Sequence, residues 1–294
     1  MQKIRSALAA LTFVLPFALA STAAAQFHVG PIASAMGGAG RAATEASESS
    51  FLNPAALSHI SHYNVDVGYQ HLDHPVEGQR TEYSALIADG NEDRVVPGSL
   101  SFVHRFTEPS PNGGAYTEQD FQAAISGFAG RQMSIGIAAH RQLYMPSVGE
   151  AGAQNNVTLG ALWAVSPTVG IGLVASDLIP SDARVPQNVR QTPTYALGSQ
   201  MILASAMIHV RADLVHPTEG PHNGRNNLML GLETKFRPDF VFRLGTQWDE
   251  TEDKMLVSTG LGFHGPRLSV EYAFQKDVRV QGGIRQMIDL WLPL

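Results

Sequence analysis

Apolar and polar side chains alternate with a period of two along most of the chain after Tyr63. A period of two is the repeat of a β-strand with one apolar and one polar face. The pattern is clearest in the segments 207–215, 228–236, 240–248, 268–275 and 284–294. The charged side chains on the polar face of these segments are His209, Arg211, Asp213, Glu233, Lys235, Arg243, Glu271, Arg285 and Asp289.

About fourteen such segments follow one another, although a count of twelve also fits the pattern. They cover residues 63–71, 81–88, 98–106, 120–128, 132–141, 157–165, 169–175, 194–201, 206–215, 228–236, 240–248, 255–263, 267–275 and 284–294. Strands of about 9 to 11 residues cross a bilayer when they are tilted. The sequence therefore predicts an all-β fold, a transmembrane antiparallel β-barrel of about 14 strands over residues 63–294.

The connections between these segments are short and long by turns. The fourth and fifth segments are joined by "AGR", the sixth and seventh by "SPT", the tenth and eleventh by "RPD", and the twelfth and thirteenth by "HGP". Most of the intervening connections are longer and rich in Gly, Pro and Asn. This alternation is typical of bacterial outer-membrane barrels, which have tight periplasmic turns and longer external loops.

Aromatic residues gather near the ends of the predicted strands, as the interfacial girdles of a membrane barrel require. They are Tyr63, Phe106, Trp163, Tyr195, Phe236, Phe240, Trp248, Phe263 and Trp291. A mean hydropathy of −0.04 does not oppose this interpretation, because a barrel with one apolar and one polar face averages to near zero.

The first 25 residues have the pattern of a secretory signal peptide. Lys3 and Arg5 precede an apolar run over 7–20, and Ala23 and Ala25 fit the small-residue cleavage rule. The apolar run is shorter than a membrane-anchoring helix needs. We therefore expect cleavage near Ala25 and localisation in the outer membrane of a Gram-negative cell, reached through the barrel-assembly machinery.

Charge and residue types exclude several classes of function. Removal of the leader leaves 18 basic against 26 acidic residues, a net charge of −8, so no nucleic-acid partner is expected. The chain has 0 Cys, and the spacing of its 11 His matches no metal-binding pattern. Because no acid, base and nucleophile set can be assembled, we expect no enzyme activity, no catalytic residue, no metal and no cofactor.

Residues 26–62 precede the barrel and lack its alternation. A barrel of about fourteen strands encloses a lumen too wide for its own side chains to fill. The glycines of "SAMGGAGRAA" allow tight turns and close approach to a wall, and Pro54 fixes a bend after Asn53. The segment is predicted to be a compact plug in the lumen. The alternative is an unfolded periplasmic leader, since such tails are also rich in small residues.

The stretch "ASAMGGAGRAATEASESSFLNPAAL" resembles the amino-terminal signature of the FadL superfamily of long-chain fatty-acid transporters. The sequence "EYAF" near the carboxyl terminus resembles the PorV/PorQ group of secretion-associated relatives. The resemblance implies a fourteen-stranded outer-membrane barrel with an amino-terminal hatch, whose movement, together with a lateral gap in the wall, releases a hydrophobic ligand. It places Gly37, Gly38, Gly40, Asn53, Pro54 and Ala55 in the hatch.

Two functions follow as hypotheses. In the first, the barrel passively transports a hydrophobic, fatty-acid-like small molecule through a plugged lumen, in contact with outer-membrane lipid. In the second, a barrel of the same fold does not transport and instead binds a periplasmic or secreted protein as an accessory of secretion or envelope assembly. The luminal charges are predicted to brace the wall and anchor the plug, or else to line a polar path on which Arg211 or Arg243 meets a carboxylate.

Overall fold

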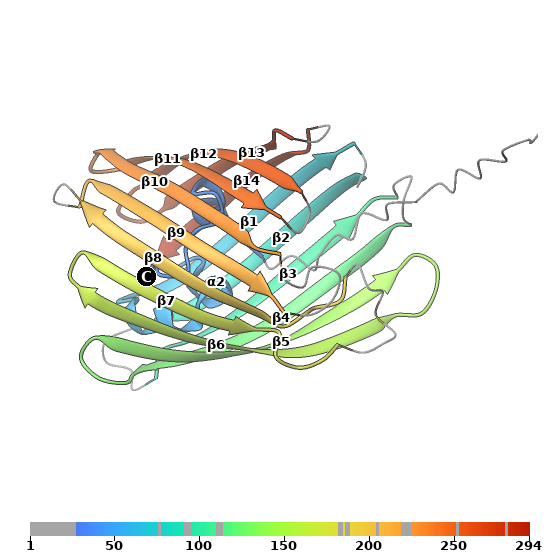
Figure 1. The fold of residues 1–294 in the computed structure, drawn as a ribbon, viewed down its shortest axis with the longest axis horizontal. Coiled ribbons are helices and arrows are strands. Elements are labelled where there is room, and N and C mark those ends of the chain that lie inside the picture. Colours follow the sequence, from blue (N-terminus) through green and yellow to red (C-terminus); the bar gives the residue numbers. More distant parts are fainter. Residues whose placement is uncertain are drawn as a thin grey trace, which may run out of the picture.

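The computed structural model describes residues 28–75, 78–90, 96–109, 114–181, 185, 189–203, 206–218, 225–250, 253–279 and 282–294. Fourteen antiparallel strands form one closed barrel (Figure 1), which confirms the predicted fold and decides the strand count. Each strand pairs with its neighbours in sequence, and β1 pairs with β14 to close the ring. The predicted signal peptide and its cleavage site lie outside the described residues.

The strands are β1 (Tyr63–His74), β2 (Gly78–Asp89), β3 (Gly98–Thr107), β4 (Tyr116–Phe128), β5 (Met133–Pro146), β6 (Gly152–Ser166), β7 (Val169–Ser176), β8 (Thr194–Leu203), β9 (Ile208–Pro217), β10 (Asn227–Arg237), β11 (Phe240–Asp249), β12 (Lys254–His264), β13 (Ser269–Asp277) and β14 (Ile284–Pro293). We call the end with the connections 129–132, 167–168 and 238–239 the turn end. The opposite end, with the connections 147–151 and 177–193, is the loop end.

The two faces of the strands differ as the alternation predicts. On β9, Val210 and Leu214 face outward and are 39% and 42% exposed, whereas Arg211 and Asp213 face the lumen and are each 1% exposed. Eight of the nine aromatic residues predicted near strand ends are exposed on the outer face. The exception is Trp291, which shares the luminal side of β14 with Asp289, because the period of two places residues 289 and 291 on one face.

Several strands are longer than the apolar alternation indicates. Strands β4, β5 and β6 have 13, 14 and 15 residues, and they take up stretches that the sequence assigns to external loops. The ladder continues there because strand pairing uses backbone groups, so polar residues next to an apolar band pair equally well. The short-and-long rhythm also fails at the start, where the loop-end connection 75–77 is shorter than the turn-end connection 90–97.

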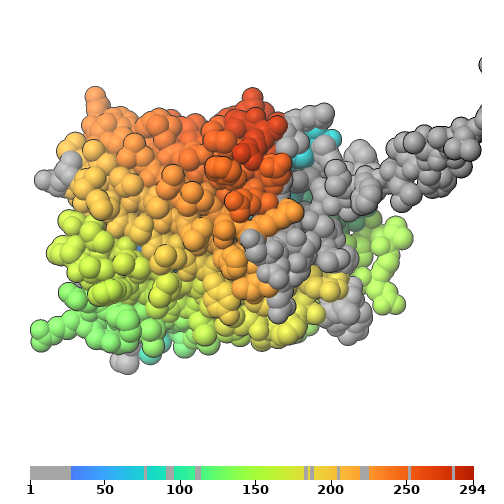
Figure 2. Space-filling model, in the orientation of Figure 1, coloured from blue at the N-terminus to red at the C-terminus, as the bar shows by residue number. Residues whose placement is uncertain are grey.

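Residues His28–His62 lie inside the barrel, and we call them the luminal segment. They contain α1 (Pro31–Ala35), α2 (Ser49–Leu52) and the 3-10 helix η1 (Pro54–His59). Their blue ribbons run through the interior in Figure 1, and the wall of strands largely hides them in the space-filling view of Figure 2. Pro31 and Pro54 each open a helix, a position where the missing N–H costs nothing. Among the described residues, no helix is long and apolar enough to cross a membrane.

Candidate functional site

The interface between the luminal segment and the barrel wall is the candidate functional site. Its closest approach is made by glycines on both sides. Gly37 and Gly38 have φ angles of 71° and 89°, which other residues rarely adopt, so they turn the chain after α1. Gly231 on β10 and Gly245 on β11 face Met36 and Gly37 so closely that a Cβ on either would collide with the backbone of the segment.

The buried carboxylate of Asp213 on the wall binds Gly40 and Arg41, which follow these glycines in the luminal segment. Asp213 Oδ2 accepts hydrogen bonds from the backbone N–H groups of Gly40 and Arg41, each 2.9 Å long. The Arg41 guanidinium donates to the same oxygen over 3.1 Å. Three donors therefore meet one acceptor on β9, and the ion pair is shielded from solvent.

Asn53 links two parts of the luminal segment to the wall. Its Nδ2 donates to the carbonyl oxygens of Arg41, 2.8 Å away, and of Ala161 on β6, 3.2 Å away. Its Oδ1 accepts from the N–H of Ala55 over 3.1 Å, which caps the start of η1. Because Asn53 is fully buried, each of these bonds replaces one to water.

The helix η1 rests on strands β4 to β6. The carbonyl oxygen of Ala55 accepts a hydrogen bond of 2.8 Å from Ser134 Oγ. Pro54 lies against Gly136 and Gly160, neither of which has room for a Cβ. The hydroxyl groups of Ser58 and Ser126 are 2.7 Å apart. The bend at Asn53 and Pro54 therefore fits a part of the wall that glycine keeps open.

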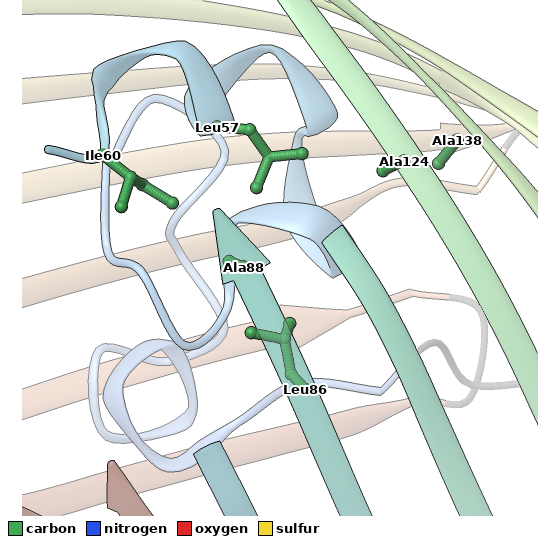
Figure 3. Close-up of a cluster of buried hydrophobic side chains, with 6 residues drawn as sticks. All are labelled: Leu57, Ile60, Leu86, Ala88, Ala124 and Ala138. Carbon is green, nitrogen blue, oxygen red and sulfur yellow. The ribbon is translucent and has the colours of Figure 1, made fainter. Parts of the chain in front are cut away.

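Apolar contacts complete the docking of η1. Leu57 and Ile60 pack against small and branched side chains that point inward from β2, β4 and β5 (Figure 3). The cluster is Leu57, Ile60, Leu86, Ala88, Ala124 and Ala138. Burial of Leu57 and of Ile60, the residue that follows η1, favours the docked state by about 2 kcal/mol each.

Glu48 is a part of the site that the sequence analysis did not identify. Its Oε1 and Oε2 accept hydrogen bonds from the N–H groups of Ile32 and Ala33, 2.7 and 2.9 Å away, which joins α2 to the start of α1. Burial raises the pKa of Glu48 from 4.5 to about 7, and the nearby Glu45 adds to the rise. The only signal in the sequence is an acidic residue within a run of small ones.

Besides Asp213, five of the predicted luminal charges lie on the wall in buried ion pairs. Arg243 on β11 lies between two carboxylates, with Nε 2.7 Å from Glu233 Oε2 and Nη1 2.5 Å from Glu271 Oε2. His209 Nδ1 is 3.0 Å from Glu233 Oε1. Arg211 on β9 pairs with Glu45 of the luminal segment and donates to Gln200 over 2.9 Å. These pairs neutralise charges that the lumen removes from water.

The other predicted luminal charges differ in their surroundings. Asp289 is buried on β14 opposite Gly68 of β1. Lys235 and Arg285 are half-buried, near the turn end of β10 and the loop end of β14. The nine candidates do not form one site, because they spread over strands β9, β10, β11, β13 and β14.

Further wall residues that the alternation did not single out contact the luminal segment. His28 pairs with Glu82 on β2, and Glu82 pairs with Arg105 on β3. Three glutamine amides donate to backbone carbonyl groups of the segment. These are Gln70 to Val29, Gln122 to Ser50 and Gln275 to Ser34. The segment is therefore held from most of the circumference of the barrel.

At the loop end, residues of the 177–193 connection lie against the inner wall. Gln154 Nε2 donates to the carbonyl oxygen of Val189 over 3.0 Å, and Gln154 Oε1 accepts from the N–H of Gln191 over 2.9 Å. Val185 and Val189 pack with Tyr144 and Tyr116. An apolar cluster thus lies at the end of the barrel away from η1.

The described strands show no lateral gap in the wall. Strand β3 pairs continuously with β2 and with β4, without a bulge. Register shifts within the described strands occur only at Lys235/Arg237 and Ala164/Ser166, both next to connections at the turn end. The lateral gap that the family resemblance implies is therefore not present in these strands.

Comparison with known proteins gives likeness of fold without likeness of sequence. No protein-family model matches the sequence, and no curated protein does. The toluene transporter TbuX of Ralstonia pickettii superposes with a TM-score of 0.72 at 11% identity, over 90% of this chain and 98% of that one. The toluene transporter TodX of Pseudomonas putida gives a TM-score of 0.71 at 12% identity, over 92% and 100%. A FadL homologue of Pseudomonas aeruginosa gives 0.67 at 12% identity, over 91% and 99%. This chain therefore has the fold of the FadL-type transporters.

Proposed function

We propose that this protein is an outer-membrane channel for passive transport of a small hydrophobic molecule, and that the luminal segment is the plug that moves to open it. The observation that carries the proposal is the docking of His28–His62 across the lumen by hydrogen bonds, ion pairs and apolar contacts alone. A non-covalent plug can leave and return, whereas a fixed core would only fill the barrel.

The outer surface supports a membrane location. Its exposed residues are apolar along the strands and aromatic near their ends, as lipid contact requires. The loop end would face the exterior and the turn end the periplasm, because outer-membrane barrels place their longer connections outside. The similar structures TbuX and TodX are described as toluene transporters, and CymD as a monoaromatic hydrocarbon channel.

The charges of the lumen favour an uncharged ligand over a fatty acid. Arg211 and Arg243 are the residues that a carboxylate would seek. Both are 1% exposed and already bonded to Glu45, Glu233 or Glu271. Separation of such a buried pair costs several kcal/mol. The cluster of Tyr116, Tyr144, Val185 and Val189 at the loop end is apolar and mostly buried, so a neutral molecule that displaces the two valines from the tyrosines would find an apolar site there.

In this proposal Gly37, Gly38, Gly40, Asn53, Pro54 and Ala55 control the plug. Gly37 and Gly38 seat it against β10 and β11, Gly40 donates to Asp213 on β9, and the residues from Asn53 to Ala55 seat it against β5 and β6. Because the described wall is continuous, movement of the plug opens a path along the barrel axis toward the turn end.

Native mass spectrometry of the protein extracted from its outer membrane in mild detergent tests the proposal. We expect a bound small lipophile that Asn53→Ala exchanges faster than wild type, while Ser199→Ala, on the exposed outer face of β8, exchanges at the wild-type rate. A protein partner that co-purifies in place of any small ligand would contradict transport and support the accessory function.

A further inference from the structure

A hollow of about 690 Å³ lies on the wall formed by β2 to β6. Its lining takes three consecutive residues from each strand, such as Leu100, Ser101 and Phe102 of β3. The middle residue of each triplet faces the lumen and the outer two face outward. A volume of this size is typical of sites that hold a small ligand.

The hollow opens on the outer surface of the barrel and not into the lumen. Its luminal members are nearly inaccessible, with Leu86 1% exposed and Asn156 2% exposed. Its outward members are open, with Leu100 65% exposed and Phe121 48% exposed. The space is therefore bounded by outward-facing side chains.

Most of the outward side chains that line the hollow are apolar, and they differ in size. Ala85, Ala123 and Ala139 provide a low floor on β2, β4 and β5. Phe102 and Phe121, whose ring centroids are 4.8 Å apart, rise beside it. A groove bounded in this way fits a flexible hydrocarbon chain, because the chain gains contacts on its sides as well as beneath it.

Arg141 is the one arginine or lysine among the described residues that line the hollow. It faces outward on β5, is exposed, and makes no hydrogen bond or ion pair within the described residues. The outward residues that precede it from the turn end are Met133, Ile135, Ile137 and Ala139, all apolar. An exposed guanidinium beside the hydrocarbon region, unpaired within the described residues, is available to an anionic lipid headgroup.

Arg141 lies at the height of the outer lipid headgroups. It is eight positions from Met133, or about 26 Å along a strand, which corresponds to about 20 Å of height at a tilt of about 40°. The apolar band of such barrels is about 25 Å tall. With the loop end outside, as in the proposed function, the guanidinium is near the outer edge of the band.

We propose that this hollow binds an acyl chain of a phosphorylated outer-leaflet glycolipid of the lipid A type, with a lipid phosphate held by Arg141. Guanidinium binds phosphate through two parallel hydrogen bonds, which supplies the charge complementarity. The neighbouring Asn155, paired with Arg141 across β5 and β6, adds an amide donor for the same headgroup. The site rests on the proposed outer-membrane location but not on transport.

Native mass spectrometry of the detergent-solubilised full chain, titrated with bisphosphorylated lipid A, tests this site. We expect Arg141→Gln to weaken binding about tenfold, as loss of a charge-assisted bidentate contact does. Ala123→Phe, which fills the floor, should also weaken it. The matched controls are Lys276→Gln, an exposed outward cation on β13, and Ala212→Phe, an outward alanine on β9. Both should bind lipid A within about twofold of wild type.

Three results would overturn the site. These are unchanged binding in both Arg141→Gln and Ala123→Phe, equal weakening in the controls, and equal affinity for lipid A from which the phosphates have been removed. Circular dichroism of each variant verifies that the barrel has folded. Since the readout is lipid binding, loss of the lipid site would leave the transport proposal intact, and failure of ligand transport would leave the lipid result standing.

Discussion

Arg41 in the luminal segment and Asp213 on β9 are 172 residues apart in sequence, yet they form a buried ion pair with Arg41 Nη1 3.1 Å from Asp213 Oδ2. The same carboxylate oxygen accepts the N–H groups of Gly40 and Arg41. This carboxylate therefore fixes both the charge and the backbone of the turn that follows the glycines.

Replacement of Asp213 should release this turn. Asp213→Ala leaves the Arg41 guanidinium and two N–H groups without their acceptor, which costs about 3 to 5 kcal/mol in buried pairs. We expect faster hydrogen exchange at residues 38–43 with little change in the strands, measured by mass spectrometry. Slow exchange at these residues in the variant would show that Asp213 does not hold the segment.

Addition of one methyl group to the wall should displace the segment. Gly245→Ala places a Cβ against the backbone of Met36 and Gly37, whereas Gly127→Ala on β4 meets no atom within 4 Å. We expect the first variant to show increased protease cleavage within residues 28–62 and increased ion conductance in planar bilayers. The Gly127→Ala variant should match wild type, and equal behaviour of the two variants would refute the close fit.

The stability of the docked segment should fall as the pH rises. The pKa of Glu48 is about 7 in the folded protein and near 4.5 when unfolded, so its favourable contribution is complete below pH 4.5 and is lost as the pH rises through 7. The difference corresponds to about 3 kcal/mol. Urea unfolding of wild type and Glu48→Gln at pH 4 and pH 8 measures it. The expected result is a larger loss in wild type, and parallel losses would contradict the role of Glu48.

Arg243 should stabilise the barrel without controlling the plug. Arg243→Met leaves Glu233 and Glu271 buried without their shared cation, at a cost of about 3 to 5 kcal/mol. Urea unfolding should show this loss, while Arg237→Met, at an exposed position near the turn end of β10, should unfold like wild type. A conductance increase in Arg243→Met with unchanged stability would assign the residue to gating instead.

The faces of the strands could be predicted from the sequence because they depend on local alternation, which left the number of strands open between twelve and fourteen. The location of the Arg211, Asp213 and Arg243 side chains in the lumen follows directly from the period of two. The prediction that Trp291 belongs to the aromatic girdle was wrong, because it relied on residue type instead of on alternation. Its position on the luminal face follows from the same period, although an aromatic residue near a strand end usually faces lipid.

The docking contacts could not be predicted in this way. Whether Glu48 meets α1, or His28 meets Glu82, depends on how a segment without periodicity folds within the lumen. The small-residue composition indicates close packing but not the wall residue that each position faces. The ends of the strands beyond the apolar band could not be predicted either, because backbone pairing there does not depend on side-chain type.

The most direct test of the plug is a reversible covalent lock. Ser58 and Ser126 have hydroxyl oxygens 2.7 Å apart, so Ser58→Cys/Ser126→Cys should form a disulfide between η1 and β4 in a chain that has 0 Cys of its own. Uptake of the small lipophile that co-purifies with the protein, by cells that produce this variant, should stop when the variant is oxidised and return when it is reduced. Ser199→Cys/Ala212→Cys, which links only the paired strands β8 and β9, should transport in both states. Full uptake by the oxidised, cross-linked Ser58→Cys/Ser126→Cys protein would contradict the claim that the luminal segment must move.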